Sequence, residues 1–262
     1  MGNLYCGNNL EIMKGMESDS IDLIATDPPF NTGLDFGEYK DRWDSMNYFV
    51  DWLRERVVEM RRLLKPTGAL YLHCDSNASH YIKVMLDEEF GMQNFVQDII
   101  WWRKNKLPDR RVVWRKYHDN ILCYKMGPDC VLQNVIFDTG EIVTRKKIKK
   151  INGKIAHLKD KVSYEKKIVL TTSMITDIAD ILPGSNKERV GYPTQKPIKL
   201  YERIITTATN EGDTILDPFC GSGTTLVAAS NLARDYIGID ENQNAIDICK
   251  ERLIGYTQCQ KA

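Results

Sequence analysis

The first stretch whose residue types could do chemistry is IDLIATDPPFNTG, residues 21–33, where an apolar run ends abruptly in Asp27. The prolines that follow fix the backbone φ angle and donate no hydrogen bond, so Pro28 and Pro29 form a stiff corner with free carbonyl acceptors. An ionised Asp27 adds further acceptors and no donor. Phe30 adds a flat face. Acceptors that converge beside a flat ring select an amino group attached to a planar base.

Such an amine is a poor nucleophile because its lone pair is delocalised into the ring. Hydrogen bonds from its two hydrogens to Asp27 and to the carbonyl of Pro28 would favour a pyramidal nitrogen whose lone pair points outward. The protein would then contribute positioning and electrostatics to a displacement reaction. Asp27 is also a candidate acceptor for the departing proton, although an ordinary carboxylate is a weak base for it.

A second stretch, TILDPFCGSGTT at residues 214–225, has an apolar run that ends in Asp217 and enters a glycine-rich turn. Gly221 and Gly223 let the backbone approach a ligand closely at the start of the next helix. The following strand, YIGID, ends in Asp240, where an acid can hold the ribose of a nucleotide. A carboxylate at Asp217 suits an ammonium better than a phosphate. S-adenosylmethionine has both the nucleoside and the ammonium.

The elements that must position these residues follow a regular alternation. Strands are expected at residues 3–7, 21–27, 69–74, 97–103, 119–125, 214–217 and 236–240. Helices are expected at residues 10–16, 46–64, 77–91, 197–212, 224–234 and 244–255. Strands that alternate with helices of this length predict a doubly wound, mostly parallel α/β sheet, with ligands at the carboxyl ends of the strands. If the strands that end at Asp27 and Asp217 are neighbours, their tips lie roughly 5 Å apart at the backbone.

The pattern weakens between residues 126 and 190, where the sequence is polar, rich in lysine and without a long period. Apolar residues persist there, so we interpret this range as an inserted region and not as a linker. Residues 1–125 and 191–262 are then expected to form one domain. The whole chain has 36 basic and 36 acidic residues and no net charge, but its middle is basic.

Composition excludes several other classes. The chain is 42% hydrophobic and 27% charged, as in ordinary globular proteins. It has no apolar run of about 18 residues, so no membrane span is expected, and its first residues lead us to expect no secretory signal. Its seven scattered cysteines lack zinc-site spacing, which favours reduced thiols in a cytoplasm and no metal. His73, Cys74 and Asp75 are adjacent, but neighbours in a strand point to opposite faces, so we expect a structural role for them.

Three motifs resemble those of amino-methylating DNA methyltransferases. DPPFNTG resembles their DPPY/DPPF catalytic motif, LDPFCGSGTT their cofactor motif, and YPTQKP, residues 192–197, the segment that lines the methionine end of the pocket. The catalytic motif comes first and a basic variable region follows it, which is similar to the β class. The resemblance implies a seven-stranded type of sheet with circularly permuted motif order, and a target-recognition role for residues 126–190.

The resemblance also implies roles for individual residues. The target base would be bound and activated by four catalytic residues: Asp27, Pro28, Pro29 and Phe30. S-adenosylmethionine would be bound by Asn8, Lys196, Asp217, Pro218, Phe219, Gly221, Ser222, Gly223, Thr224 and Asp240. Asn8 departs from the family pattern, which often has an acid there, but an amide can still hydrogen-bond an adenine edge.

A base inside duplex DNA cannot reach such a pocket without leaving the stack, so base flipping is implied. Basic residues would then contact phosphates while the insertion reads sequence. The candidates for these contacts are Arg103, Lys104, Lys106, Arg110, Arg111, Arg115, Lys146, Lys147, Lys149 and Lys150.

The prediction is a site-specific DNA methyltransferase that transfers the methyl group of S-adenosylmethionine to adenine N6 of double-stranded DNA. Cytosine N4 is the alternative, because it too is an exocyclic amine beside a ring nitrogen. An RNA or protein-glutamine methyltransferase and a catalytically inactive DNA-binding module are further alternatives. A cognate restriction nuclease and a homodimer are open partners.

Overall fold

The computed structural model describes residues 2–35, 37, 40–103, 116–133, 136–151, 154–170, 173–181 and 188–259. Five of the basic residues expected to contact DNA lie outside these ranges: Lys104, Lys106, Arg110, Arg111 and Arg115. The chain divides into two compact units, residues 1–133 with 173–262, and residues 134–172. The separate unit therefore occupies the middle of the range 126–190.

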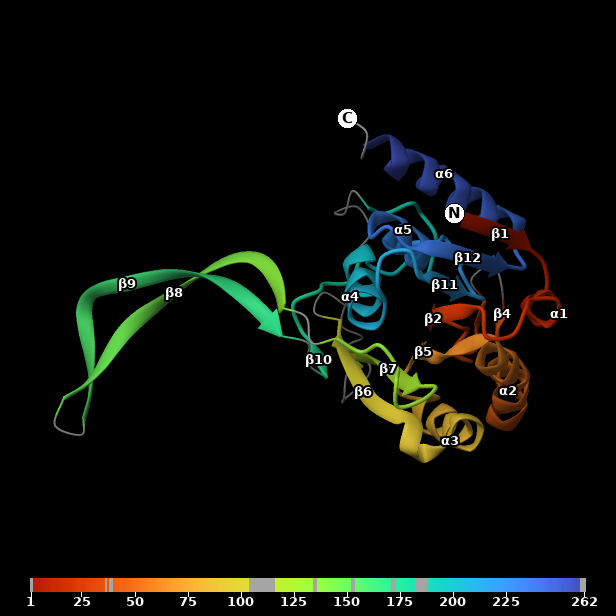
Figure 1. Ribbon diagram of the computed structural model, residues 1–262, viewed down its shortest axis with the longest axis horizontal. Coiled ribbons are helices and arrows are strands. Elements are labelled where there is room, and N and C mark those ends of the chain that lie inside the picture. The colour runs from red at the N-terminus through yellow and green to blue at the C-terminus, as the bar shows by residue number, and fades with distance from the viewer. Residues whose placement is uncertain are drawn as a thin grey trace. The chain divides into compact units, whose positions relative to one another are not determined.

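The first unit contains an eight-stranded sheet in the order β1-β12-β11-β2-β5-β7-β6-β10 (Figure 1). Its strands are β1 Gly2–Cys6, β2 Ile21–Thr26, β5 Leu64–Cys74, β6 Phe95–Trp102, β7 His118–Lys125, β10 Met174–Ile175, β11 Thr214–Asp217 and β12 Asp235–Asp240. Within this sheet only β7 runs antiparallel to its neighbours. The predicted mostly parallel sheet is confirmed, with the short β10 as an eighth strand at the edge beside β6.

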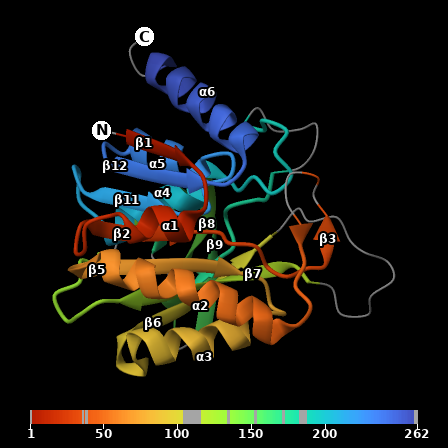
Figure 2. The same cartoon turned by 90° about the vertical axis from the view of Figure 1, so that its right-hand side faces the viewer.

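Helices cover both faces of this sheet, as a doubly wound fold requires. They are α1 Asn9–Lys14, α2 Met46–Leu63, α3 Ser79–Phe90, α4 Ile198–Ala208, α5 Thr224–Asn231 and α6 Gln243–Cys259. Figure 2 shows α1, α2 and α3 in front of the stacked strands. Successive residues of β2 serve the two layers in turn: Leu23 packs with α4, α5 and α6, whereas Ile24 packs with α1, α2 and α3. The alternation follows from the two-residue period of a strand, and it buries β2 on both faces.

The start of β5 differs from the expectation. A helix ending at residue 64 and a strand beginning at residue 69 were expected, but β5 begins at Leu64, directly after α2, and includes Pro66. The pairing with β2 shifts register here, since Ile21 faces Leu64 and Leu23 faces Ala69. Proline lacks the N–H that a regular ladder needs, and the irregular pairing accommodates it.

Two short segments complete the first unit. Strands β3 Leu34–Asp35 and β4 Lys40–Asp41 form an antiparallel pair, and the 3-10 helix η1 spans Met92–Asn94.

No helix in the described ranges is long and apolar enough to span a membrane. Nor do the described residues contain a group of three or more His, Cys, Asp or Glu that could hold a metal ion.

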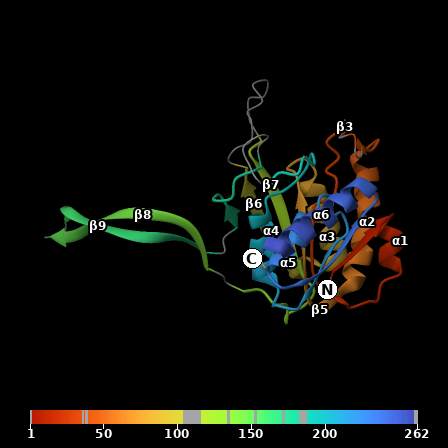
Figure 3. The ribbon, with the colours of Figure 1, turned by 90° about the horizontal axis from the view of Figure 1, so that it is seen from above.

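The second unit is a long two-stranded antiparallel ribbon of β8 Ile136–Ile151 and β9 Lys154–Leu170 (Figure 3). Ile136 pairs with Leu170 at one end and Ile151 with Lys154 at the other. The sequence of this range has no regular period. Strict alternation marks a strand with one buried face, whereas the pairing of β8 with β9 is interrupted by two register shifts, between Asp138 and Ile142 and between Lys146 and Ile148.

Candidate active site

The two strand ends singled out in the sequence meet at one edge of the sheet. β2 and β11 are parallel neighbours, with Ile24 opposite Leu216. Thr26, the last residue of β2, donates a hydrogen bond from Oγ1 to Oδ1 of Asp217 at 2.7 Å. Asp27 and Asp217 both line a cavity of about 580 Å³. The expected common cleft of the two motifs is therefore present.

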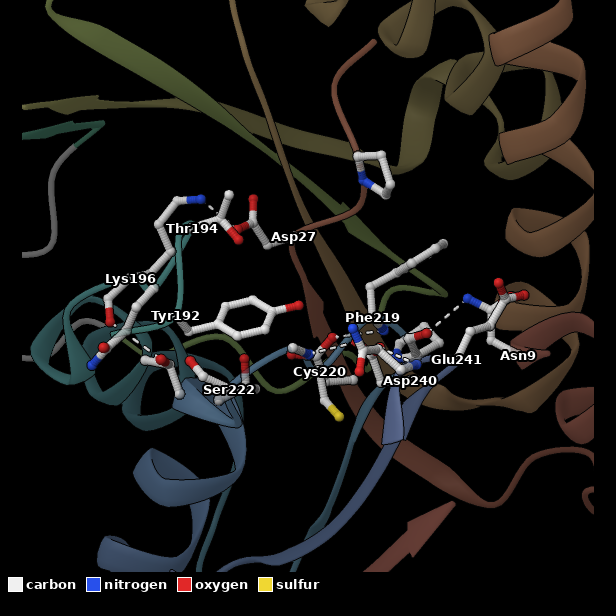
Figure 4. A pocket seen from close by; sticks show the side chains of 18 of the residues that line it. Asn9, Asp27, Tyr192, Thr194, Lys196, Phe219, Cys220, Ser222, Asp240 and Glu241 are labelled. Atoms are coloured by element: carbon white, nitrogen blue, oxygen red, sulfur yellow. Dashed lines mark hydrogen bonds and ion pairs between the residues drawn. The ribbon is translucent and has the colours of Figure 1, made fainter. Parts of the chain in front are cut away.

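The cavity collects residues from every part of the first unit that was expected to carry chemistry (Figure 4). The expected residues that line it are Asn8, Asp27, Pro29, Lys196, Asp217, Pro218, Phe219, Gly221, Ser222, Thr224 and Asp240. The other three expected residues are next to lining residues in the sequence but do not line the cavity themselves: Pro28, Phe30 and Gly223. The cavity is also lined by other residues of the expected motifs: Tyr192, Thr194 and Gln195 of YPTQKP, and Cys220 and Thr225 of LDPFCGSGTT. Further lining residues, which lie outside the motifs found in the sequence, are Asn9, Trp43, Trp52, Arg56, Tyr201, Glu241 and Asn242.

Lys196 lies beside the carboxylate of Asp27. Its Nζ forms an ion pair with Oδ2 of Asp27, and Figure 4 shows the two side chains pointing toward one another. The same ammonium lies 5.2 Å from the ring centre of Phe30. Sequence reasoning placed Lys196 with the cofactor. In the structure its charge compensates that of Asp27.

Asp217 is only 3% exposed. Burial raises the pKa of its carboxyl to about 7, although the hydroxyl of Thr26 and the backbone N–H of Phe219 donate to it and oppose that rise. The cause is the cost of removing a charge from water. A cation in the cavity would favour the ionised form, because opposite charges attract strongly where water is excluded.

The glycine-rich turn brings its backbone to the cavity in a conformation that other residues resist. Gly223, the N-cap of α5, has φ +79°, and a Cβ built on it would lie 2.6 Å from Sγ of Cys249. Asp240 braces the same turn by accepting a hydrogen bond from the N–H of Gly221 at 2.9 Å. Its other oxygen accepts from the N–H of Asn242 at 2.9 Å. Asp240 also lines the cavity, so its carboxylate both supports the turn and contributes to the cavity wall.

An aromatic and polar cluster forms another part of the cavity wall. The rings of Trp43 and Trp52 lie 4.8 Å apart, and the guanidinium of Arg56 lies 4.0 Å from the centre of the Trp52 ring. Arg56 donates to Oδ1 of Asn9 at 2.9 Å, and Asn9 donates to the carbonyl of Pro218 at 2.7 Å. These contacts join residues up to 209 positions apart in sequence, so no local spacing could have indicated them.

Asn8, which was expected at the adenine, has a local structural role. Its Oδ1 caps α1 by accepting from the N–H of Leu10 at 3.0 Å, and satisfying a free N–H at a helix start is what Asn commonly does. Its amide nitrogen remains a donor on the cavity wall. Asn9, the next residue, is the one that reaches the cofactor motif.

Arg103 was expected to contact DNA. Its Nε donates to Oδ2 of Asp180 at 2.8 Å, and its Nη1 lies 3.2 Å from Oδ2 of Asp119. Two carboxylates of the first unit thus compensate its charge, which argues against a phosphate contact. Lys146, Lys147, Lys149 and Lys150 belong to β8 in the second unit.

The family described as DNA methylase matches residues 21–251. The chain therefore belongs to the DNA methylase family. It is an enzyme that transfers a methyl group from S-adenosylmethionine, and DNA is its partner.

Three individual proteins illustrate the similarity. Type II methyltransferase M.HpaI of Haemophilus parainfluenzae is 34% identical over 95% of this chain and 73% of its own length. DNA adenine methyltransferase YhdJ of Escherichia coli (strain K12) is 29% identical over 94% of this chain and 81% of its own length. The crystal structure of the M1.HpyAVI–SAM complex superposes with a TM-score of 0.60 and 25% identity, covering 97% of this chain and 99% of that one.

Proposed function

We propose that this protein methylates N6 of adenine at a specific sequence in double-stranded DNA, with the target base flipped into the cavity. The observation that carries the proposal is the common cavity of Asp27 and Asp217. It provides hydrogen-bond acceptors for an amine beside a place for the methyl donor. The name of the YhdJ relative, a DNA adenine methyltransferase, supports adenine.

The residues of the cavity fit S-adenosylmethionine, which when bound supplies an electrophilic methyl group. Trp43, Trp52 and Phe219 offer flat faces for a purine. Asp240 and the exposed Glu241 offer acceptors for ribose hydroxyls. The start of α5 favours the carboxylate of an amino acid, because helix N-termini attract negative charge.

Asp27 and the carbonyl of Pro28 would hold the two hydrogens of the amino group of the target base. Phe30 would stack on its ring. The ion pair with Lys196 orients the carboxylate before the base arrives. Preorganised acceptors of this kind act by positioning and by stabilising the charge that develops on nitrogen.

Residues 126–190 would recognise the target sequence. A two-stranded antiparallel ribbon fits the major groove of B-form DNA, where each base pair presents a distinct pattern of donors and acceptors. β8 and β9 form such a ribbon, and β8 contains Lys146, Lys147, Lys149 and Lys150. Lysines of this kind add sequence-independent phosphate contacts.

The type II designation of M.HpaI supports a protective role beside a cognate restriction nuclease. Such a role would be carried out in the cytoplasm, where the enzyme meets chromosomal DNA. A homodimer is a further proposal, which sedimentation of the purified protein would test.

Transfer of a tritiated methyl group to DNA, RNA and protein, assayed in parallel, tests the proposal. We expect label in double-stranded DNA and none with Asp27→Ala. Digestion to nucleosides then separates N6-methyladenine from N4-methylcytosine. Label in N4-methylcytosine would show that the target base is cytosine and not adenine. Label in RNA or protein alone would show that DNA is not the substrate. Sequencing with direct detection of modified bases would identify the site.

A further inference from the structure

A row of buried polar side chains leads from Asp27, after β2, to the neighbouring strands β5 and β7. His73 and Asp119 come from the antiparallel neighbours β5 and β7, and they are 1% and 3% exposed. Sequence reasoning gave His73 a structural role and did not assign Asp119. Buried polar groups are costly unless they are paired, so their arrangement calls for a physical reason.

The contacts run in one line. Nδ1 of His73 lies 3.7 Å from Oδ1 of Asp27, and Nε2 of His73 lies 3.3 Å from Oδ2 of Asp119. The same oxygen of Asp119 lies 3.2 Å from Nη1 of Arg103. Within the described residues, neither Oδ1 of Asp27 nor Nδ1 of His73 has a hydrogen-bond partner, although both atoms are buried. Oδ1 of Asp27 and Nδ1 of His73 are therefore opposite each other at 3.7 Å, with no other partner among the described residues.

The chemistry of Asp119 decides which nitrogen of His73 carries the proton. Burial alone would raise the pKa of Asp119, but the contact with His73 and the charges of Arg103 and Lys196 hold that pKa well below its usual range. An ionised carboxylate only accepts hydrogen bonds, so Nε2 must be the donor. In a neutral ring Nδ1 then presents a lone pair to an oxygen of Asp27, and a single proton would join the two atoms.

The proposed reaction creates a proton that needs such a place. As the amino nitrogen bonds to the methyl carbon, the carbon–sulfur bond breaks and its electron pair stays on sulfur. The nitrogen is left with a positive charge and loses it by releasing one hydrogen as a proton. Asp27 is within reach of that proton but is a weak base.

We propose that His73 is a positioning residue that receives this proton from Asp27, through Oδ1 of the carboxylate and Nδ1 of the ring. The ring becomes an imidazolium between two carboxylates, Asp27 is restored to its ionised form, and the proton leaves to solvent after the product departs. Asp119 holds the ring in the tautomer that can accept, and Arg103 holds Asp119.

The surroundings of the ring suit this role. Carboxylates face it from the loop after β2 and from β7, namely those of Asp27 and Asp119. The nearby cations, Arg103 at the end of β6 and Lys196 before α4, each pair with one of these carboxylates. The rings of Phe30 and Trp101, 5.6 and 5.8 Å from that of His73, limit its movement.

The first test is the pH dependence of methyl transfer in a single turnover, at saturating DNA and S-adenosylmethionine, for the unaltered enzyme and His73→Asn. An imidazolium that already holds a proton cannot accept another, so we expect the unaltered rate to fall on the acid side. We expect His73→Asn to lower the rate about tenfold to a hundredfold and to lack that acid limb. Dissociation constants for S-adenosylmethionine and DNA should change by less than about twofold.

A matched control is His80→Asn, because His80 is exposed on α3 and outside the cavity. We expect it to keep both the rate and the acid limb. A rate for His73→Asn within about twofold of the unaltered enzyme, or a slower rate with the acid limb intact, would overturn the proposal. If His73→Asn fails to fold, Asp119→Asn replaces it: we expect the same loss of rate, because the ring loses the partner that fixes its tautomer, and a rate within about twofold of the unaltered enzyme would overturn the proposal.

A second measurement does not depend on turnover. Nitrogen-15 spectra of histidine-labelled enzyme, assigned by comparison with a His73 variant, should show the neutral ring of His73 protonated at Nε2. A neutral ring protonated at Nδ1 would overturn the proposal. The inference rests on the proposed function, but the failures differ: an enzyme that methylates no amine refutes the function, whereas the spectra report on the histidine alone.

Discussion

Thr26 donates a hydrogen bond to Asp217 at 2.7 Å, and this contact joins the end of β2 to the end of β11. The two residues are 191 positions apart in sequence. Both side chains are almost completely buried. The places that we propose for the target amine and for the methyl donor thus lie at the ends of adjacent strands, and such rigid support is what an in-line displacement needs.

Asp27→Asn should lower the single-turnover rate of methylation by about 10²-fold to 10³-fold, because it removes the charge that faces the developing cation on nitrogen. Affinity for S-adenosylmethionine should stay within about twofold, since Asp27 is assigned to the base. Asp51→Asn, an exposed position on α2, is the control and should keep full activity. An Asp27→Asn enzyme as fast as its parent would remove Asp27 from the mechanism.

Affinity for S-adenosylmethionine should rise with pH up to about 7, because burial raises the pKa of Asp217 to about 7 and the ammonium needs the ionised carboxylate. Below that value the affinity should fall by up to about tenfold per pH unit. Calorimetry between pH 5.5 and 7 measures this. Asp217→Asn should bind weakly and without this dependence, and a dependence unchanged in Asp217→Asn would contradict the assignment.

The same group should also change the stability of the ligand-free protein. A raised pKa means that the folded state favours the protonated form, so the stabilisation is complete below the unfolded pKa of about 4 and is lost as pH rises to about 7. Asp217→Asn has no such loss. The Tm of Asp217→Asn relative to its parent should therefore increase between pH 4 and 7, as measured by calorimetric unfolding, and a constant difference would argue against a raised pKa.

Asp240 and Glu241 should differ in how they support cofactor binding. Asp240→Asn removes a charge that braces the backbone of Gly221, so it should lower both affinity and Tm. Glu241→Gln should lower affinity alone, because Glu241 is exposed on the cavity wall. Titration with cofactor and thermal unfolding separate the two effects. DNA binding without cofactor should be unchanged in both variants, and equal losses of DNA and cofactor binding would contradict the ribose role.

Gly223→Ala should be more harmful than Gly212→Ala. Both glycines have positive φ, +79° and +84°, and a Cβ in this region costs about 1–2 kcal/mol. Only at Gly223 would the new Cβ also collide with Cys249, since nothing lies within 4 Å of a Cβ at Gly212. Denaturant unfolding should show the larger loss of stability for Gly223→Ala, accompanied by weaker cofactor binding. Equal losses would show that the collision is relieved.

Replacing Lys146, Lys147, Lys149 and Lys150 together with glutamine should flatten the salt dependence of DNA affinity. Each lost phosphate contact reduces the slope of log affinity against log salt by about 0.9. Lys14→Gln with Lys250→Gln is the control, because these ammonium groups pair with Glu11 and Asp247. An unchanged slope in the quadruple variant would show that these four lysines of β8 make no phosphate contacts.

The sequence alone determined the local features of this protein. The run from residue 21 to Asp27, the turn after Asp217 and the alternation of strands and helices each follow from neighbouring residue types. Backbone restriction by proline, the freedom of glycine and the periods of strands and helices act within a few residues. The sheet type and the two chemical motifs could therefore be predicted, and the parallel pairing of β2 with β11 confirmed that the motifs share one cavity.

Only the tertiary structure decided which side chains meet across the sheet. The pairing of Lys196 with Asp27, the link from Arg56 to the cofactor motif through Asn9, and the approach of His73 to Asp119 join residues from 46 to 209 positions apart. Such contacts depend on strand order and register. A single sequence contains no periodic signal for either, because a side chain's partner across a sheet is set by the packing of all the elements together.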